Sequence, residues 1–95
     1  MVIGRCEIQL DLPGIHSLKQ KRSVLKGLKA RVHKEFNVSC AEIEFHDVWQ
    51  SAALGVAVAT NSAAHAERVL EQVVYWIERY RPDVQVVDHH IEVIF

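Results

Sequence analysis

Apolar and polar residues alternate along the first twelve positions of the chain. One face of this segment carries Val2, Gly4, Cys6, Ile8, Leu10 and Leu12, and the other carries Ile3, Arg5, Glu7, Gln9 and Asp11. A period of about two residues predicts a half-buried β-strand over residues 2–12. Pro13-Gly14 then predicts its end, since this pair favours a turn.

The apolar spacing becomes helical after the turn. Ser17 and Gln20 have the spacing of a capping box, and Asn37 is suited to the left-handed conformation that ends helices. We therefore expect a helix that begins after Ser17 and ends near Phe36-Asn37. Its apolar stripe would contain Leu18, Leu25, Leu28, Val32 and Phe36.

Two further strands are predicted over residues 38–45 and 48–60, joined by a turn at His46-Asp47. The apolar phase changes within the first of them, which predicts a β-bulge near Ala41. In the second, one face carries Val48, Ala52, Leu54, Val56 and Val58. The opposite face carries Trp49, Ser51 and an unusually small row of residues, namely Ala53, Gly55, Ala57 and Ala59.

A second helix and a last strand complete the chain. Asn61 or Ser62 is the expected N-cap, and the helix should run to about Arg81, before Pro82. The residues expected on its apolar side are Ala66, Val69, Leu70, Val73, Trp76, Ile77 and Tyr80. Residues 84–95 predict a strand with a phase change near Asp88.

The order strand, helix, strand, strand, helix, strand predicts an α+β fold. It is typical of a ferredoxin-like βαββαβ sandwich, a four-stranded antiparallel sheet with both helices on one face. We expect a single domain over residues 1–95. In this fold the third strand lies between the first and second, so Cys6 and Cys40 should be two strand spacings apart and remain free thiols.

Charge is distributed unevenly. The formal net charge is −1, yet residues 1–34 carry eight Lys and Arg residues with two acids, whereas residues 35–95 carry three with ten acids. At about 100° per residue, one side of the first helix gathers its bases within an arc of roughly 80°. This basic stripe consists of Lys19, Arg22, Lys26, Lys29 and His33.

The basic stripe has two interpretations. It can bind the phosphates of a nucleic acid, with strong salt dependence and little sequence preference. Alternatively, it is a solvated face, or one neutralised within the molecule by acids of the second helix, Glu67, Glu71 and Glu78.

The sequence offers little support for catalysis or metal binding. The six histidines lack metal-ligand spacing, and neighbours such as His89 and His90 point to opposite faces of a strand. The four glycines form no phosphate-binding loop, and no nucleophile accompanies His46-Asp47. We therefore expect no enzyme activity, no metal and no cofactor. The open face of the sheet also lacks the aromatic residues with which RNA-recognition domains stack bases.

Three segments carry a family resemblance. HSLKQKR at residues 16–22, FNVS at 36–39 and DVWQSAALGVAVATN at 47–61 resemble the YlxP-like family of small bacterial proteins, also called DUF503. One departure is Gln20, where we would expect Glu. The resemblance implies a ferredoxin-like fold and a gene setting among translation initiation and ribosome-maturation factors, and it implies no catalytic residues.

The leading hypothesis is a non-enzymatic accessory protein that contacts ribosomal RNA or a ribosome-associated protein through the basic stripe. The alternative is an oligomerising module, such as a homodimer, or a small-ligand sensor that uses the open sheet face at Ala53, Gly55, Ala57 and Ala59. We expect a cytoplasmic protein, because the sequence shows neither a leader of the secretory type nor a run of roughly 20 apolar residues.

Overall fold

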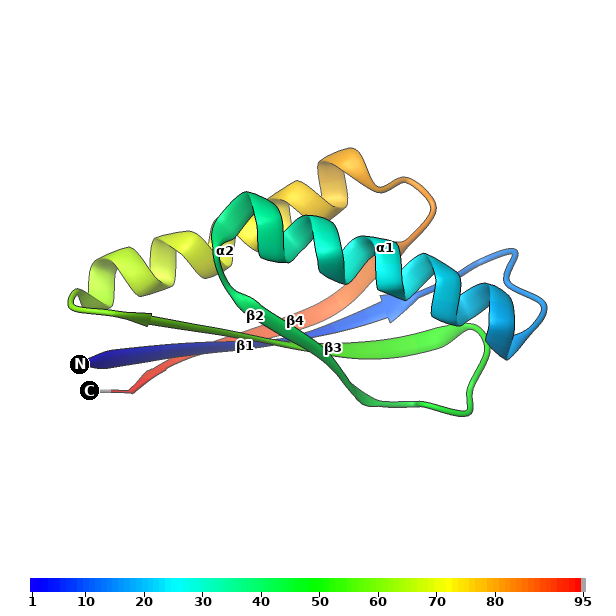
Figure 1. The fold of residues 1–95 in the computed structure, drawn as a ribbon, viewed down its shortest axis with the longest axis horizontal. Coiled ribbons are helices and arrows are strands. Elements are labelled where there is room, and N and C mark those ends of the chain that lie inside the picture. The colour runs from blue at the N-terminus through cyan, green and yellow to red at the C-terminus, as the bar shows by residue number, and fades with distance from the viewer. Residues whose placement is uncertain (95) are drawn as a thin grey trace.

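The computed structural model describes residues 1–94, and its elements occur in the predicted order (Figure 1). They are β1 (Val2–Asp11), α1 (Leu18–Phe36), β2 (Ser39–Glu44), β3 (Ser51–Thr60), α2 (Ala63–Tyr80) and β4 (Gln85–Ile94). The strands form one antiparallel sheet in the order β2-β3-β1-β4, and both helices lie on one side of it. The predicted βαββαβ sandwich is confirmed.

The strand order separates the two cysteines as expected. Cys6 of β1 and Cys40 of β2 both pair with Val56 of β3, from opposite sides. They are thus two strand spacings apart, about 10 Å, which exceeds the reach of a disulfide. Both thiols are free.

The predicted helix ends are confirmed by their hydrogen bonds. Ser17 Oγ accepts a bond of 3.0 Å from the backbone N–H of Gln20. The Gln20 side chain reaches back to the N–H of His16, at 2.9 Å, instead of that of Ser17. Asn37 ends α1 in the left-handed region, with φ 51° and ψ 50°, and Ser62 caps α2.

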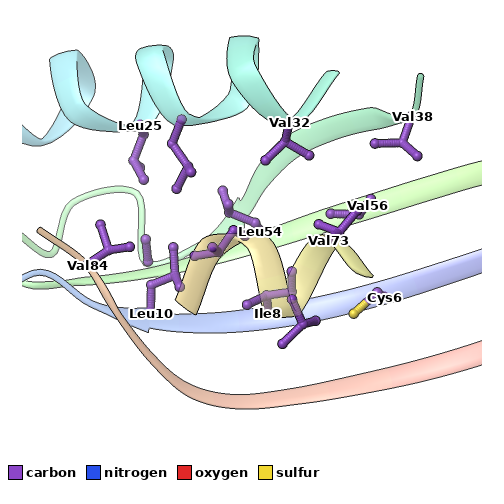
Figure 2. Packing of buried hydrophobic residues seen from close by; sticks show 14 of the residues in the cluster. Cys6, Ile8, Leu10, Leu25, Val32, Val38, Leu54, Val56, Val73 and Val84 are labelled. Atoms are coloured by element: carbon purple, nitrogen blue, oxygen red, sulfur yellow. The ribbon is translucent and has the colours of Figure 1, made fainter. Parts of the chain in front are cut away.

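The core fills the space between the sheet and the two helices (Figure 2). Most of its members come from β1, β3, α1 and α2, and they include Ile8, Leu10, Leu28, Leu54, Leu70 and Ile77, all fully buried. Gly4 allows α2 to approach β1 closely, since a Cβ there would lie 3.0 Å from Leu70 Cδ1 and 3.1 Å from Ala66 Cβ. The apolar face predicted for β1 is therefore confirmed.

The predicted bulge in β2 is present, but it lies at Ile43, two residues after Ala41. Ala41 keeps a regular pairing with Gly55, and the register shifts between Glu42 and Glu44. Glu42 stays on the helix side of the sheet, while Ile43 lies against Gly55 on the open face. The apolar phase changes because Glu42, and not an apolar residue, occupies the position of β2 that faces the helices.

Two other expectations about side chains are wrong. Val48 lies outside β3 and is 46% exposed, because its N–H closes a turn onto the carbonyl of Phe45 at 3.0 Å. Tyr80, the last residue of α2, is 59% exposed, and Val74 is buried in the core.

The phase change predicted near Asp88 is confirmed. Asp88 pairs with Gln9 and Val86 with Leu10, so β4 bulges between Val86 and Asp88.

Candidate nucleic-acid interface

The basic stripe lies on the side of α1 that faces away from α2. Arg31 marks the opposite side: nine residues after Arg22, it is about 180° away on the helix. The Arg31 guanidinium lies over the ring of Trp76 in α2, 5.8 Å from its centroid. Lys19, Arg22 and Lys26 are exposed to solvent. The structure therefore brings the predicted bases together on a surface that α2 leaves open.

The same surface follows the β2 edge of the sheet. Lys29 is partly buried and lies near enough to Cys40 of β2 to lower the thiol pKa, although burial outweighs this effect and raises that pKa to about 11. His33 Nδ1 is 2.7 Å from the carbonyl oxygen of Val38, just before β2. Within residues 1–94, β2 pairs only with β3, so its other edge is unpaired in this part of the chain. The basic stripe thus runs beside an unpaired strand edge.

His33 differs from the other members of the basic stripe. Its Nδ1 contact with Val38 is satisfied when that nitrogen carries the proton and donates to the carbonyl. The backbone carbonyl of His33 also accepts the N–H of Asn37, at 3.0 Å. The residue therefore helps to close the end of α1, and only its other ring nitrogen remains for a partner.

Internal salt bridges leave the basic stripe out. Within residues 1–94, the five ion pairs are Arg5–Glu7, Lys21–Glu42, Arg31–Glu35, Arg81–Asp83 and His90–Glu92. None of them uses a stripe residue, and none joins α1 to α2. Neutralisation by the acids of α2 is therefore not seen in this part of the chain, and the stripe keeps its positive charge.

Lys21 is the base that sequence reasoning missed. It is 1% exposed, and its Nζ donates to the carbonyls of Phe45 at 2.5 Å and Val48 at 2.6 Å. Glu42 Oε2 lies 3.0 Å from the same nitrogen without hydrogen-bond alignment, so this contact is an ion pair. A signal was present, since Lys21 falls between Leu18, Leu25 and Leu28 on the apolar side of the helix.

Lys21 and Gln50 hold the connection between β2 and β3 against the start of α1. Phe45, in this connection, has φ 64°, in the left-handed region. Farther along, the Gln50 side chain donates to the carbonyl of Ile15 at 3.2 Å, and the Gln50 carbonyl accepts the N–H of Leu12 at 3.0 Å. These contacts hold the connection between β2 and β3 in place, in addition to the turn at His46-Asp47.

The small residues of β3 do not form one continuous exposed row. Ala57 and Ala59 are exposed, Gly55 is partly covered by Ile43, and Ala53 is 8% exposed, between Gln9 and Glu44 on the adjacent strands. A hollow of about 350 Å³ lies over this part of the open face. Its lining includes Arg5, Glu7, Ile43, Gly55 and Ala57. The accessible part of the predicted interface is thus Gly55, Ala57 and Ala59.

Within residues 1–94, no three His, Cys, Asp or Glu side chains are grouped so as to hold a metal ion. In the same range, neither helix is long and apolar enough to cross a membrane.

The family assignment rests on a match over almost the whole chain. Residues 3–91 match the model of a family described as "Protein of unknown function (DUF503)". The chain belongs to the DUF503 family. A relative in Bacillus subtilis (strain 168), "Uncharacterized protein YlxP", is 36% identical over 84 residues, which is 88% of this chain and 90% of the relative. The resemblance read from the sequence is confirmed.

A solved structure supports the fold independently. A de novo designed protein with a ferredoxin fold, determined by solution NMR, superposes with a TM-score of 0.55 over 99% of this DUF503 chain and 84% of the design. Sequence identity is 13%, so this likeness concerns the fold alone.

Proposed function

We propose that this DUF503 protein is a non-enzymatic accessory protein that binds RNA through the basic stripe of α1. The observation that carries the proposal is the placement of Lys19, Arg22, Lys26 and Lys29 on one side of a helix, without salt bridges among residues 1–94. Several bases aligned in this way can contact successive phosphates of one backbone.

Two of the three other Lys and Arg residues of α1 are paired, which supports this proposal. Arg31 pairs with Glu35 at 3.3 Å, and Lys21 pairs with Glu42 at 3.0 Å. The third, Lys34, is exposed and has no salt bridge within residues 1–94. Lys19, Arg22 and Lys26 are left exposed, and an external polyanion is the natural partner for them.

Ribosomal RNA, free or within a ribosome-associated complex, is the partner class that we propose. The gene setting implied by the family resemblance favours it, and such an activity belongs in the cytoplasm. Recognition by Lys and Arg alone would read phosphate positions and RNA shape more than sequence. The protein would then position or protect RNA and would need no bond-breaking step.

Charge reversal on the stripe tests the proposal. In the double variant Arg22→Glu/Lys26→Glu, two exposed bases become acids, so stability should change little. The protein should lose most of its association with ribosomal particles and with purified ribosomal RNA in sedimentation and filter-binding assays. For the parent, raising salt from about 50 to about 200 mM should weaken binding on the order of a hundredfold if about four phosphates are contacted.

The matched control is Arg68→Glu/Arg79→Glu, which makes the same change in net charge on α2. Both arginines are exposed, and this variant should bind nearly as well as the parent. If the α1 and α2 variants lose the same amount of binding, only net charge matters. Equal binding by the α1 variant and the parent, or binding that ignores salt, would overturn the proposal.

A further inference from the structure

The connection between β2 and β3 exposes a group of large apolar side chains. We call residues 45–49 the hairpin tip. Phe45 is 39% exposed, Val48 46% and Trp49 50%. In a turn of this size, solvent would favour polar side chains, and grouped exposed apolar residues commonly mark an interaction site. The exposure of Trp49 therefore needs an explanation beyond the fold.

Lys21 of α1 holds the backbone of the hairpin tip in one arrangement. Lys21 Nζ binds the carbonyls of both Phe45 and Val48, and the Phe45 carbonyl also accepts the N–H of Val48 at 3.0 Å. A left-handed φ is unfavourable for a bulky residue such as Phe45. A buried cation thus offsets backbone strain, and the tip presents its side chains from a fixed frame.

Trp49 lies at the end of the molecule where the basic stripe begins. On one side of it, Val48 is bound to Lys21 in the first turn of α1; on the other, Gln50 is bound to Ile15 in the loop that leads into α1. Trp49 is bracketed by these two anchors. Lys19 and Arg22 belong to the same first turns of the helix. Figure 1 shows the connection between β2 and β3 beside the start of α1.

Trp49 exposes its indole at the end of the molecule where the basic stripe begins, and this arrangement is complementary to a single-stranded nucleic acid. The nucleobases of a single strand stack on aromatic side chains, and Lys and Arg bind the phosphates between them. A duplex buries the faces of its nucleobases, so it can contact only the basic side chains of the stripe. The other aromatic platform known for this fold order, the open sheet face, carries Arg5, Gly55 and Ala57 at its centre.

We infer that Trp49 is the stacking platform for an unpaired base of a single-stranded RNA whose backbone follows the basic stripe from Lys19 towards Lys29. This inference rests on the proposed function and specifies its ligand as unpaired RNA. Lys21 is a positioning residue for the platform, since it contacts the tip backbone and is too deeply buried to meet the ligand.

The test compares Trp49→Ala with the parent on three probes of about ten nucleotides: a single-stranded RNA, an RNA duplex, and a single strand of abasic sugar-phosphate. Trp49→Ala should bind the single-stranded RNA about tenfold to a hundredfold more weakly. The two proteins should bind the duplex and the abasic strand equally, because these probes offer phosphates without an accessible base. Trp49→Phe should retain most of the affinity.

Tyr75→Ala is the matched control, because Tyr75 is an aromatic residue that is 61% exposed on the outer side of α2. Its RNA affinity should equal that of the parent. In a Trp76→Phe background, which leaves Trp49 as the indole among residues 1–94, single-stranded RNA should quench the fluorescence and the abasic strand should not.

The outcomes separate the two proposals. If the parent binds single-stranded RNA with the expected salt dependence and Trp49→Ala binds it equally well, the platform is wrong and the proposed function stands. If the parent binds none of the three probes, both are wrong. If the parent self-associates in sedimentation and Trp49→Ala becomes monomeric without losing RNA affinity, the hairpin tip is a protein interface and the inference is overturned.

Discussion

Lys21 of α1 and Glu42 of β2 form a buried ion pair across the helix–sheet interface, with 3.0 Å between Nζ and Oε2. The side chain of Lys21 is 2% exposed and that of Glu42 17%. Two carbonyls of the hairpin tip also contact the ammonium group. A charge removed from water in this way is tolerated because two carbonyl oxygens and a carboxylate compensate it.

Replacing Lys21 by Met should therefore destabilise the fold well beyond a surface substitution. The change removes two hydrogen bonds and leaves Glu42 without its counter-charge, so we expect a loss of about 2–4 kcal/mol in the free energy of unfolding. Urea denaturation measures it. Lys19→Met, on the exposed part of the same helix turn, should stay within about 0.5 kcal/mol of the parent.

The pair itself is tested by adding Glu42→Gln. Because removal of one charge exposes the other as uncompensated, the double variant Lys21→Met/Glu42→Gln should lose less stability than the two single variants added together. Strict additivity would show that the two side chains do not interact energetically.

Two glycines should respond to alanine with opposite signs. At Gly4 a Cβ would meet Leu70 Cδ1 at 3.0 Å and Val58 Cγ1 at 3.2 Å, so Gly4→Ala should cost about 1–3 kcal/mol by overpacking. At Gly27, within α1, a Cβ meets nothing within 4 Å. Gly27→Ala should raise stability by about 0.5–1 kcal/mol, because alanine is the better helix former. Thermal unfolding distinguishes these signs directly, and a stabilised Gly4→Ala would contradict the packing.

The fold could be predicted from the sequence because most of its signals are local. Alternation in β1 reports which side chains face the core, and Ser17, Gln20 and Asn37 mark the ends of α1 by hydrogen bonds with near neighbours. The basic stripe was also predictable, since a helical period places its members on one side whatever lies around the helix.

Non-local contacts account for what the sequence did not reveal. Lys21 reaches partners 24 and 27 residues away, so its burial depends on where β2 and the hairpin tip are placed. The same contacts keep Glu42 inward, which moved the bulge from Ala41 to Ile43. Val48 continued an alternating pattern, but its backbone closes a turn instead. The same alternation predicts a strand face for Trp49, whereas its position near the start of α1 follows from the contacts of Val48 with Lys21 and of Gln50 with Ile15.

Titration of the two thiols gives a pH-dependent prediction. Burial raises the pKa of Cys6 and of Cys40 from 9.0 to about 11. Between about pH 9 and pH 11 the unfolded chain therefore loses thiol protons that the folded chain keeps, and the free energy of unfolding should fall as pH rises. Below pH 9 this contribution is fully present.

The matched variant for that titration is Cys40→Ala. Other side chains of the protein also lose protons in alkaline solution. The informative quantity is therefore the difference between variant and parent in the slope of the free energy of unfolding against pH. Removal of one thiol should make the decrease shallower by up to about 1.4 kcal/mol per pH unit. Parallel curves from pH 9 to 11, measured by urea denaturation, would show that Cys40 titrates alike in both states.

The last prediction concerns self-association through the open sheet face. Ala57 is exposed beside the hollow lined by Arg5, Ile43 and Gly55. The small side chains at Gly55, Ala57 and Ala59 permit close approach of a second copy, so we expect the protein to form dimers that light scattering detects at high concentration. Ala57→Glu would place an unpaired charge in that interface, and the variant should remain folded but become monomeric. Ala53→Ser is the control. Because Ala53 is already covered within one chain, this substitution should leave the association unchanged. If the parent is monomeric at the highest concentration measured, or if Ala57→Glu dimerises as the parent does, the open face is not the interface.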